Sequence, residues 1–163
     1  MSDPALSLRN PEHRVSTRAP VVWAVSALVA DLVVLAGLFT ARGVGWWDVP
    51  WWAWTAYAAG VVVNVGVVPL VRYRVHRWES TETAVLTRTG WLTTEVRVAP
   101  MSRVQTVDLE QGVVERLCGL ASVTVTTASA AGPLKIQGID LPVARGLVEE
   151  LTRRAGAEPG DAT

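Results

Sequence analysis

An acidic side chain stands in the middle of a long apolar stretch. Residues 20–41 carry one charge, Asp31, and residues 51–71 carry none but include the amide of Asn64. A charged carboxylate inside hydrocarbon is costly, so Asp31 is expected to be protonated or to have a polar partner, for which Asn64 is the nearest candidate. Two chemistries fit such a group: a hydrogen bond that holds helices together, or the relay of a proton or an ion.

Charged and amide side chains are also concentrated in two blocks further along the chain. They are Arg103, Gln105 and Asp108 in the first block, and Glu115 and Arg116 in the second. In a structural interpretation, Arg116 forms an ion pair with Glu115, Asp108 or Glu110. The Gln105 amide would then satisfy backbone groups at a β-bulge. In a functional interpretation, the two blocks form a recognition surface for a partner's peptide or for an acidic group.

Catalytic chemistry has little support in the sequence. The chain has one cysteine, Cys118, and two histidines, so the spacing supports neither a nucleophilic triad nor a Cys-rich zinc site. No glycine-rich phosphate loop follows a strand pattern. The 15 basic and 15 acidic side chains cancel, which argues against a general nucleic-acid binder. We therefore expect no catalytic residues, no metal, no cofactor and no nucleic-acid partner, and we expect Cys118 to be a small buried hydrophobe.

The two apolar stretches have the length of membrane spans. A helix rises 1.5 Å per residue and needs about 20 residues to cross a ~30 Å hydrocarbon core. Both stretches reach that length without a polar stripe. We predict transmembrane helices over about 20–41 and 51–71, with an external loop over 42–50. Arginines are concentrated before the first span and after the second, so the positive-inside rule places both chain ends in the cytoplasm, with a tail over 1–19.

Two kinds of side chain are expected at the membrane surfaces. Five of the eight tryptophans lie around the external loop: Trp46, Trp47, Trp51, Trp52 and Trp54. Indole prefers the headgroup region, so they are expected to anchor the hairpin, the alternative being an aromatic site for an external ligand. At the other surface, Arg72, Arg74 and Arg77 form a basic collar that sets the topology and attracts anionic membrane lipids.

Beyond residue 71 the pattern changes to that of a small β-rich domain. Six Val- and Thr-rich strands are predicted over 72–78, 83–88, 91–98, 103–110, 121–127 and 134–138. A tight turn is expected at Thr89-Gly90, a bulge in the fourth strand and a helical turn over 112–118. An amphipathic helix capped by Asp140 and ended by Gly156 follows.

These elements predict a membrane-anchored α+β fold: a two-helix hairpin, then an antiparallel sheet or partly open barrel with a C-terminal helix over 72–155, and a disordered tail over 156–163. The helix has one apolar face, made of Ala144, Leu147, Val148, Leu151 and Ala155.

Two sequence blocks, in this order, resemble a known family. One reads PMSRVQTV from Pro100, and the other reads QGVVERLCGLA from Gln111. They are similar to motifs of the membrane-flanked, YdbS-like family of bacterial pleckstrin-homology (PH) domains, over about residues 21–154. Cys118 stands where a larger apolar residue is usual, and Val113 where proline is common. The resemblance implies a PH-like barrel or sandwich in the bacterial cytoplasmic membrane, and pairing with a larger membrane protein that repeats the domain, but no biochemical activity.

The sequence therefore predicts a non-enzymatic, membrane-anchored module for interaction or assembly. Its expected partners are membrane lipids and either another membrane protein with similar domains or a second copy of the chain. Ala56, Gly60 and Asn64 recur at four-residue spacing, which is typical of a face for close helix packing. The alternatives are a small transport or ion-relay subunit that uses Asp31, and a sensor of anionic lipid through the basic collar.

Overall fold

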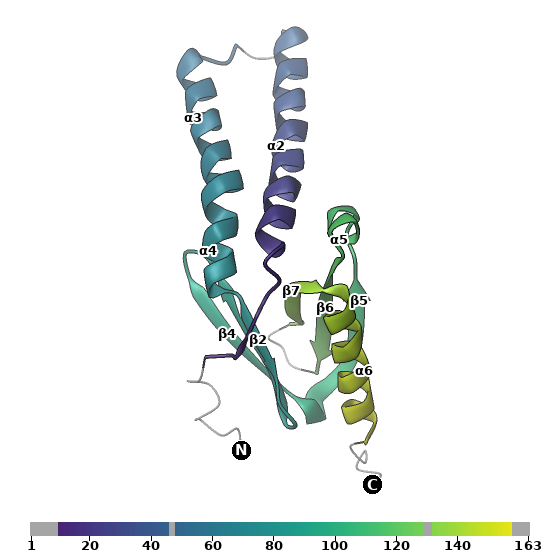
Figure 1. Ribbon diagram of the computed structural model, residues 1–163. Helices are drawn as coiled ribbons and strands as arrows, with labels where there is room; N and C mark the ends of the chain where they lie inside the picture. The colour runs from purple at the N-terminus through teal and green to yellow at the C-terminus, as the bar shows by residue number, and fades with distance from the viewer. Residues whose placement is uncertain (1–9, 46–47, 129–131, 158–163) are drawn as a thin grey trace.

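The computed structural model describes residues 10–45, 48–128 and 132–157, and shows two long helices standing on a β-rich domain (Figure 1). The first long helix is α2 (Ala19–Gly43), with Pro20 in its first turn, where no backbone N–H is needed. The second consists of α3 (Trp51–Val62), a π-helical stretch η1 (Val63–Val67) and α4 (Val68–Val75). Both are long and apolar enough to cross a membrane. Only 6% of the 18-residue apolar stretch in each helix is buried inside the structure. Such exposure is typical of a lipid-facing helix and not of the core helix of a soluble domain.

The second long helix continues four residues further than its apolar run. The prediction of a strand over 72–78 is wrong for its first part, because the helix runs to Val75 and β2 begins at Arg77. The backbone N–H of His76 still donates to the carbonyl of Arg72 at 2.7 Å, so the helical ladder extends past the last apolar residue. Arginine is a good helix former, and here the packing of α4 on the domain outweighs the strand-like alternation of the sequence.

Within the described residues, seven antiparallel strands form two sheets, which do not close into one barrel. The first sheet has the order β1 (His13–Arg14), β2 (Arg77–Ser80), β3 (Ala84–Gly90), β4 (Thr94–Pro100). The second has the order β5 (Val104–Glu110), β6 (Leu120–Thr127), β7 (Leu134–Asp140). A short 3-10 turn, η2 (Met101–Arg103), leads from the first sheet to the second. The PH-like architecture predicted from the sequence is confirmed in these two sheets and the helix that follows them.

Two local predictions can be compared directly with the strands. The bulge is confirmed, since the β5–β6 register shifts between Val104 and Thr106. The turn predicted at Thr89-Gly90 lies later, over residues 91–93, because β3 extends through Gly90. Gly90 has a φ of 137° and approaches the carbonyl of Thr93 so closely that no side chain would fit. The structure also adds β1, which pairs with β2 and brings the segment before α2 into the domain.

Two apolar clusters hold the domain together. The larger one lies between the sheets and α6 (Leu141–Ala157), whose buried face includes Ala144, Leu147 and Leu151, as the period of the sequence predicts. The smaller one joins Ala19 and Val22 of α2 to Leu120 of β6. The hairpin therefore shares a packed core with the domain and is not tethered to it by a flexible linker.

Candidate functional site

The second motif block builds the short helix α5 (Val113–Cys118) and its connection to β6. The Glu115 carboxylate accepts hydrogen bonds from the backbone N–H of Gly112 and from the Ser122 hydroxyl, both at 2.8 Å. The Gln111 amide donates to the carbonyl of Leu120 at 2.6 Å. Gly119 ends the helix in a left-handed conformation, with φ at 69°. Glu115 therefore caps its own helix, which is a structural role.

The predicted recognition residues lie at two ends of one strand. Arg103 precedes β5 and Gln105 is at its bulge, whereas Arg116 lies on α5, beyond the other end of β5. A strand rises about 3.4 Å per residue, so the seven residues of β5 separate the two groups by about 20 Å. Arg103, Gln105 and Asp108 are exposed, as is Arg116. Their role as an interaction surface stays a prediction, but the two blocks do not form one compact patch.

The ion pair predicted for Arg116 is wrong. Within the part of the chain that the structure describes, Glu115 is engaged in the cap, Glu110 pairs with Lys135 at 2.6 Å, and Asp108 accepts a hydrogen bond from Thr106 at 3.2 Å. The Gln105 side chain likewise makes no hydrogen bond among these residues, although the bulge is where we expected it. The exposed Arg116 guanidinium is left available for a group outside the chain.

The basic collar is dispersed over two elements. The Arg72 guanidinium lies over the Trp23 ring, 4.5 Å from its centroid, and donates to Gln137 at 2.8 Å. Arg72 and Arg77 are half-buried, so Arg74 is the one exposed residue of the three. Neither Trp23 nor Gln137 was predicted to take part in a site. The contact between Trp23 and Arg72 could have been inferred from the sequence, because Trp23 lies one turn from the end of its span. A cation on the facing helix can stack on an indole at that place.

His76 links the last turn of α4 to β2 and is buried, with 5% of its surface exposed. Its Nδ1 lies 3.0 Å from the carbonyl oxygen of Arg72, and a carbonyl only accepts, so Nδ1 carries a proton. Burial, together with the positive charge of Arg72, lowers the pKa of His76 to about 4. The ring is therefore neutral at physiological pH and serves as a packed, hydrogen-bonded part of the junction.

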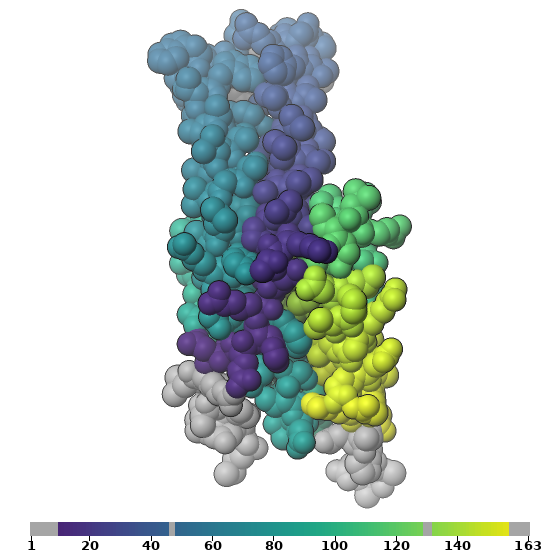
Figure 2. All heavy atoms as spheres, in the orientation of Figure 1, coloured from purple at the N-terminus to yellow at the C-terminus, as the bar shows by residue number. Residues whose placement is uncertain are grey.

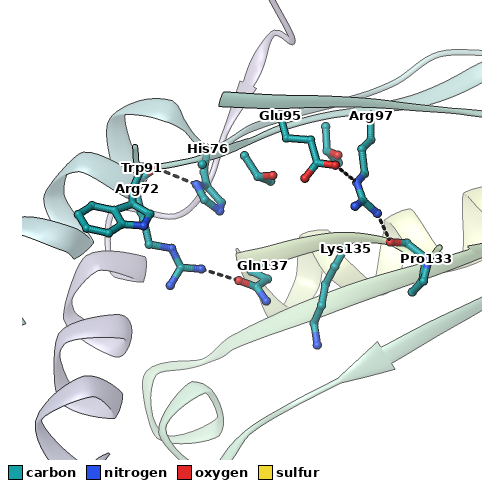
Figure 3. A pocket seen from close by; sticks show the side chains of 11 residues that line it. Arg72, His76, Trp91, Glu95, Arg97, Pro133, Lys135 and Gln137 are labelled. Carbon is teal, nitrogen blue, oxygen red and sulfur yellow. Dashed lines mark hydrogen bonds and ion pairs between the residues drawn. The ribbon is translucent and has the colours of Figure 1, made fainter. Parts of the chain in front are cut away.

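A polar cleft of about 350 Å³ opens beside this junction, between the β3–β4 hairpin and β7 (Figure 3). Its cationic side chains all have partners. Arg97 pairs with Glu95 at 2.7 Å and also donates to the carbonyl of Pro133 at 3.0 Å. Arg72 and Lys135 have the partners described above. The charges of Arg97 and Lys135 are thus compensated by carboxylates, whereas that of Arg72 is held by a neutral amide and the Trp23 ring, and the cleft can offer hydrogen bonds to a polar group.

Asp31 and Asn64 are joined directly within the hairpin. The Asn64 amide donates to the Asp31 carboxylate at 3.1 Å, and the Tyr57 hydroxyl donates to the Asp31 backbone carbonyl at 2.5 Å. With the spans ending at 20 and 71, the helical rise places these residues at depths that differ by about 6 Å, so we expected a contact only through tilt or water. The extension of the second helix to Val75 brings the two depths to within about 2 Å of each other.

The π-helical stretch that contains Asn64 has a local cause. Pro69 lies in the first turn of α4 and has no N–H for the carbonyl of Val65. A wider π turn immediately before a proline is a common way to absorb such a break in the hydrogen-bond ladder.

Of the tryptophans in the predicted outer belt that the structure describes, two are exposed and Trp54 is half-buried. Trp51 and Trp52 are 78% and 60% exposed, while Trp54 stacks on Phe39 with ring centroids 5.2 Å apart. Trp46 and Trp47 lie outside the described residues. The exposed indoles at the end of the hairpin fit an anchoring role in lipid headgroups.

The remaining reactive side chains have structural surroundings. Cys118 packs against the cluster of Ala19 and Leu120, but it is half-buried and not buried as expected, and its carbonyl accepts from Arg18 at 3.4 Å. Within residues 10–45, 48–128 and 132–157, no three His, Cys, Asp or Glu side chains are grouped as metal ligands would be.

Comparison with known proteins agrees with the architecture. The family model for the bacterial PH domain matches residues 21–155. The UPF0699 transmembrane protein YdbS of Bacillus subtilis (strain 168) is 26% identical over 159 residues, which cover 93% of this chain and 97% of that protein. No solved structure matches the chain. Since the family model covers both long helices and nearly all of the β-rich domain, the resemblance noted in the sequence is confirmed, and the chain belongs to the bacterial PH domain family.

Proposed function

We propose that this protein is a non-enzymatic assembly module whose hairpin binds other membrane helices and whose PH-like domain lies on the cytoplasmic face. The observation that carries the proposal is the Asp31–Asn64 pair. Both residues lie halfway along their helices, and the Asn64 side chain is exposed on the flank of the hairpin.

A polar pair at this depth with one exposed member, Asn64, needs a cover. Hydrocarbon offers no hydrogen-bond partner, so polar side chains in spans face protein or a water-filled cavity. Two helices bury only one side of each other, and Asn64 has donor and acceptor capacity beyond its bond to Asp31. A further helix on this flank would satisfy that capacity and remove the pair from lipid.

The surface around Asn64 has the shape for such a helix. A groove of about 500 Å³ runs along the second helix, lined by Ala59, Gly60, Val63, Asn64, Val68 and Trp91. A side chain added at Gly60 would meet open space, so Gly60 itself does not pack against α2. Small residues allow close approach of two helix backbones. The partner that fits is another membrane protein with similar domains, or a second copy of this chain.

Charge supports the cytoplasmic placement of the domain. Arg14 and Arg18 precede α2, and Arg72 and Arg74 lie in the last turns of α4, so both domain-side ends of the hairpin are basic. Arg42 is the one basic residue near the opposite end, and Asp48 offsets it. Basic residues near span ends are retained on the cytoplasmic side.

The test is purification of the full chain at native expression in a mild detergent, after crosslinking in the membrane. We expect a complex with a second membrane protein or with itself, identified by mass spectrometry. Gly60→Leu should abolish the complex by filling the groove, whereas Val62→Leu, on the opposite lipid-facing side of the helix, should leave it intact. Recovery of monomers alone from the wild type, or equal effects of the two variants, would reject the proposal.

A proton-relay role is the second candidate, because the carboxylate of Asp31 lies in the middle of a span. Asp31→Asn separates the two functions. It retains an amide oxygen that can accept from Asn64, so assembly should survive, whereas a group that carries a proton would be lost. Proton flux into reconstituted vesicles that is present in the wild type and absent in Asp31→Asn would favour the relay.

A further inference from the structure

The most exposed large apolar side chains of the PH-like domain occur at two places. Leu117 and Val113 on α5 are 84% and 78% exposed, and Leu92 in the β3–β4 turn is 79% exposed. Trp91, beside Leu92, is 47% exposed. Val113 and Leu117 are four residues apart and share one face of α5. Leucine, valine and tryptophan at this level of exposure mark a contact surface when they gather at specific points.

Both places lie beside the hairpin, on opposite sides of it (Figure 1). The first turns of α2, from Val22 to Ser26, line a shared cavity with Val113 on α5, which projects next to α2 in the space-filling view (Figure 2). On the other side, Trp91 lines the groove that contains Val68 and Asn64. With a rise of 1.5 Å per residue, these contacts lie roughly 5–10 Å from the domain end of α2 and roughly 10–17 Å from the domain end of the second helix.

The length of the spans shows how deep in the bilayer these contacts of α5 and Trp91 with the helices lie. A hydrocarbon core takes about 20 helical residues. Twenty residues counted from Arg42, at the far end of α2, toward the domain reach Val22. Twenty residues counted from Trp52, at the far end of the second helix, toward the domain reach Arg72. The contacts of α5 with α2 and of Trp91 with the second helix thus lie at or inside the hydrocarbon boundary on the domain's side.

We infer that the β3–β4 turn and the Val113/Leu117 face of α5 insert into the lipid leaflet next to the domain, where they straddle the hairpin. The occupant of both surfaces is lipid: acyl chains around Leu92 and Leu117, and headgroups around Trp91, since indole prefers that region. Arg116, exposed and adjacent to Leu117, is placed to meet a lipid phosphate there. Trp91 also lines the groove proposed for a partner helix, whereas Leu92 and the Val113/Leu117 face do not, so insertion of those apolar side chains does not depend on the proposed assembly.

Two inserted points on opposite sides of a hairpin fix the tilt of the domain as well as its distance from the membrane. The end of the domain that carries η2 is then turned away from the lipid (Figure 1). Arg103 and Gln105, which are exposed at that end, would face the aqueous phase and remain open to a soluble segment of a partner.

The test measures the depth of nitroxide spin labels on the full chain in vesicles of phosphatidylethanolamine and phosphatidylglycerol. Labels are attached at Leu92→Cys and Leu117→Cys in a Cys118→Ser background, with Ser102→Cys and Thr152→Cys as exposed controls on the domain. We expect the ratio of collisions with oxygen to collisions with a water-soluble nickel chelate to be severalfold higher at 92 and 117 than at 102 and 152.

Two results would overturn the inference. A collision ratio at 92 and 117 equal to that of the controls would show that both sites lie in water. Low collision rates with both reagents would show that protein, such as a second copy of the chain, covers them. If Leu117→Cys fails to fold, Val113→Cys reports from the same face of α5.

Discussion

Protonation of His76 should destabilise the junction between the hairpin and the domain. The ring is buried and its pKa is lowered to about 4, first by burial and then by the charge of Arg72. The unfolded chain takes up this proton near pH 6.5, the ordinary value, while the folded chain resists it until about pH 4. The destabilisation is therefore absent above pH 6.5, grows as the pH falls toward 4, and is constant below that.

The size of the effect follows from the two pKa values. A difference between 6.5 and about 4 corresponds to about 3 kcal/mol of folding free energy at pH 4. Carboxylates also titrate in this range, so the effect must be isolated by a variant. His76→Gln keeps a donor for the carbonyl of Arg72 and cannot be protonated. When the pH is lowered from 7 to 4, the free energy of unfolding of this variant should therefore rise by about 3 kcal/mol relative to that of the wild type.

Two measurements check the reasoning. Nuclear magnetic resonance titration of the two histidine rings should give one midpoint near 4 that disappears in His76→Gln. Arg72→Gln should move this midpoint upward, whereas Arg74→Gln, which alters an exposed side chain, should leave it unchanged. A His76 midpoint near 6.5 in the wild type, or equal pH dependence of stability in wild type and His76→Gln, would refute the argument.

Two further substitutions test the packing of the junction and of the motif helix by denaturation midpoints. Gly138→Ala should destabilise the protein by at least about 1–2 kcal/mol, because Gly138 has a φ of 72° and a new Cβ would lie 2.7 Å from that of Ala19; Gly146→Ala, which meets open space in a helix, should instead stabilise by about 0.5–1 kcal/mol. Glu115→Ala should cost about 1–2 kcal/mol through the loss of the cap, whereas Arg116→Ala should change stability by less than about 0.5 kcal/mol.

The long elements of this fold could be predicted because their patterns repeat over many residues. The apolar runs and the buried face of α6 depend on composition and period, and the structure has both. Short elements were less predictable. Residues 72–75 alternate in polarity as a strand does, and only their packing on the domain keeps them helical. The two-residue strand β1 has no pattern of its own and exists because β2 offers it an edge.

The sequence identified the motif residues without separating their roles. Glu115 and Arg116 are adjacent and charged, yet one accepts two internal hydrogen bonds and the other is exposed. On a short helix, adjacent residues point about 100° apart, so the start of α5 decides which of them faces Ser122. The contact of Arg72 with Gln137 was also unpredictable, since Gln137 is 65 residues away and is brought near only by the complete fold.

The junction makes the hairpin and the domain one mechanical unit. The backbone N–H of Ser16 donates to the carbonyl of Gly138 at 2.8 Å, so the segment before α2 is bonded to β7. Arg72, at the end of the other helix, reaches the same strand through Gln137. Any contact that fixes or shifts the two helices in the membrane therefore acts on β7 directly. If the hairpin assembles in the bilayer as proposed, that assembly would act on the orientation of the domain through β7, and Gly138→Ala, which crowds Ala19 of α2, should weaken this coupling on the α2 side.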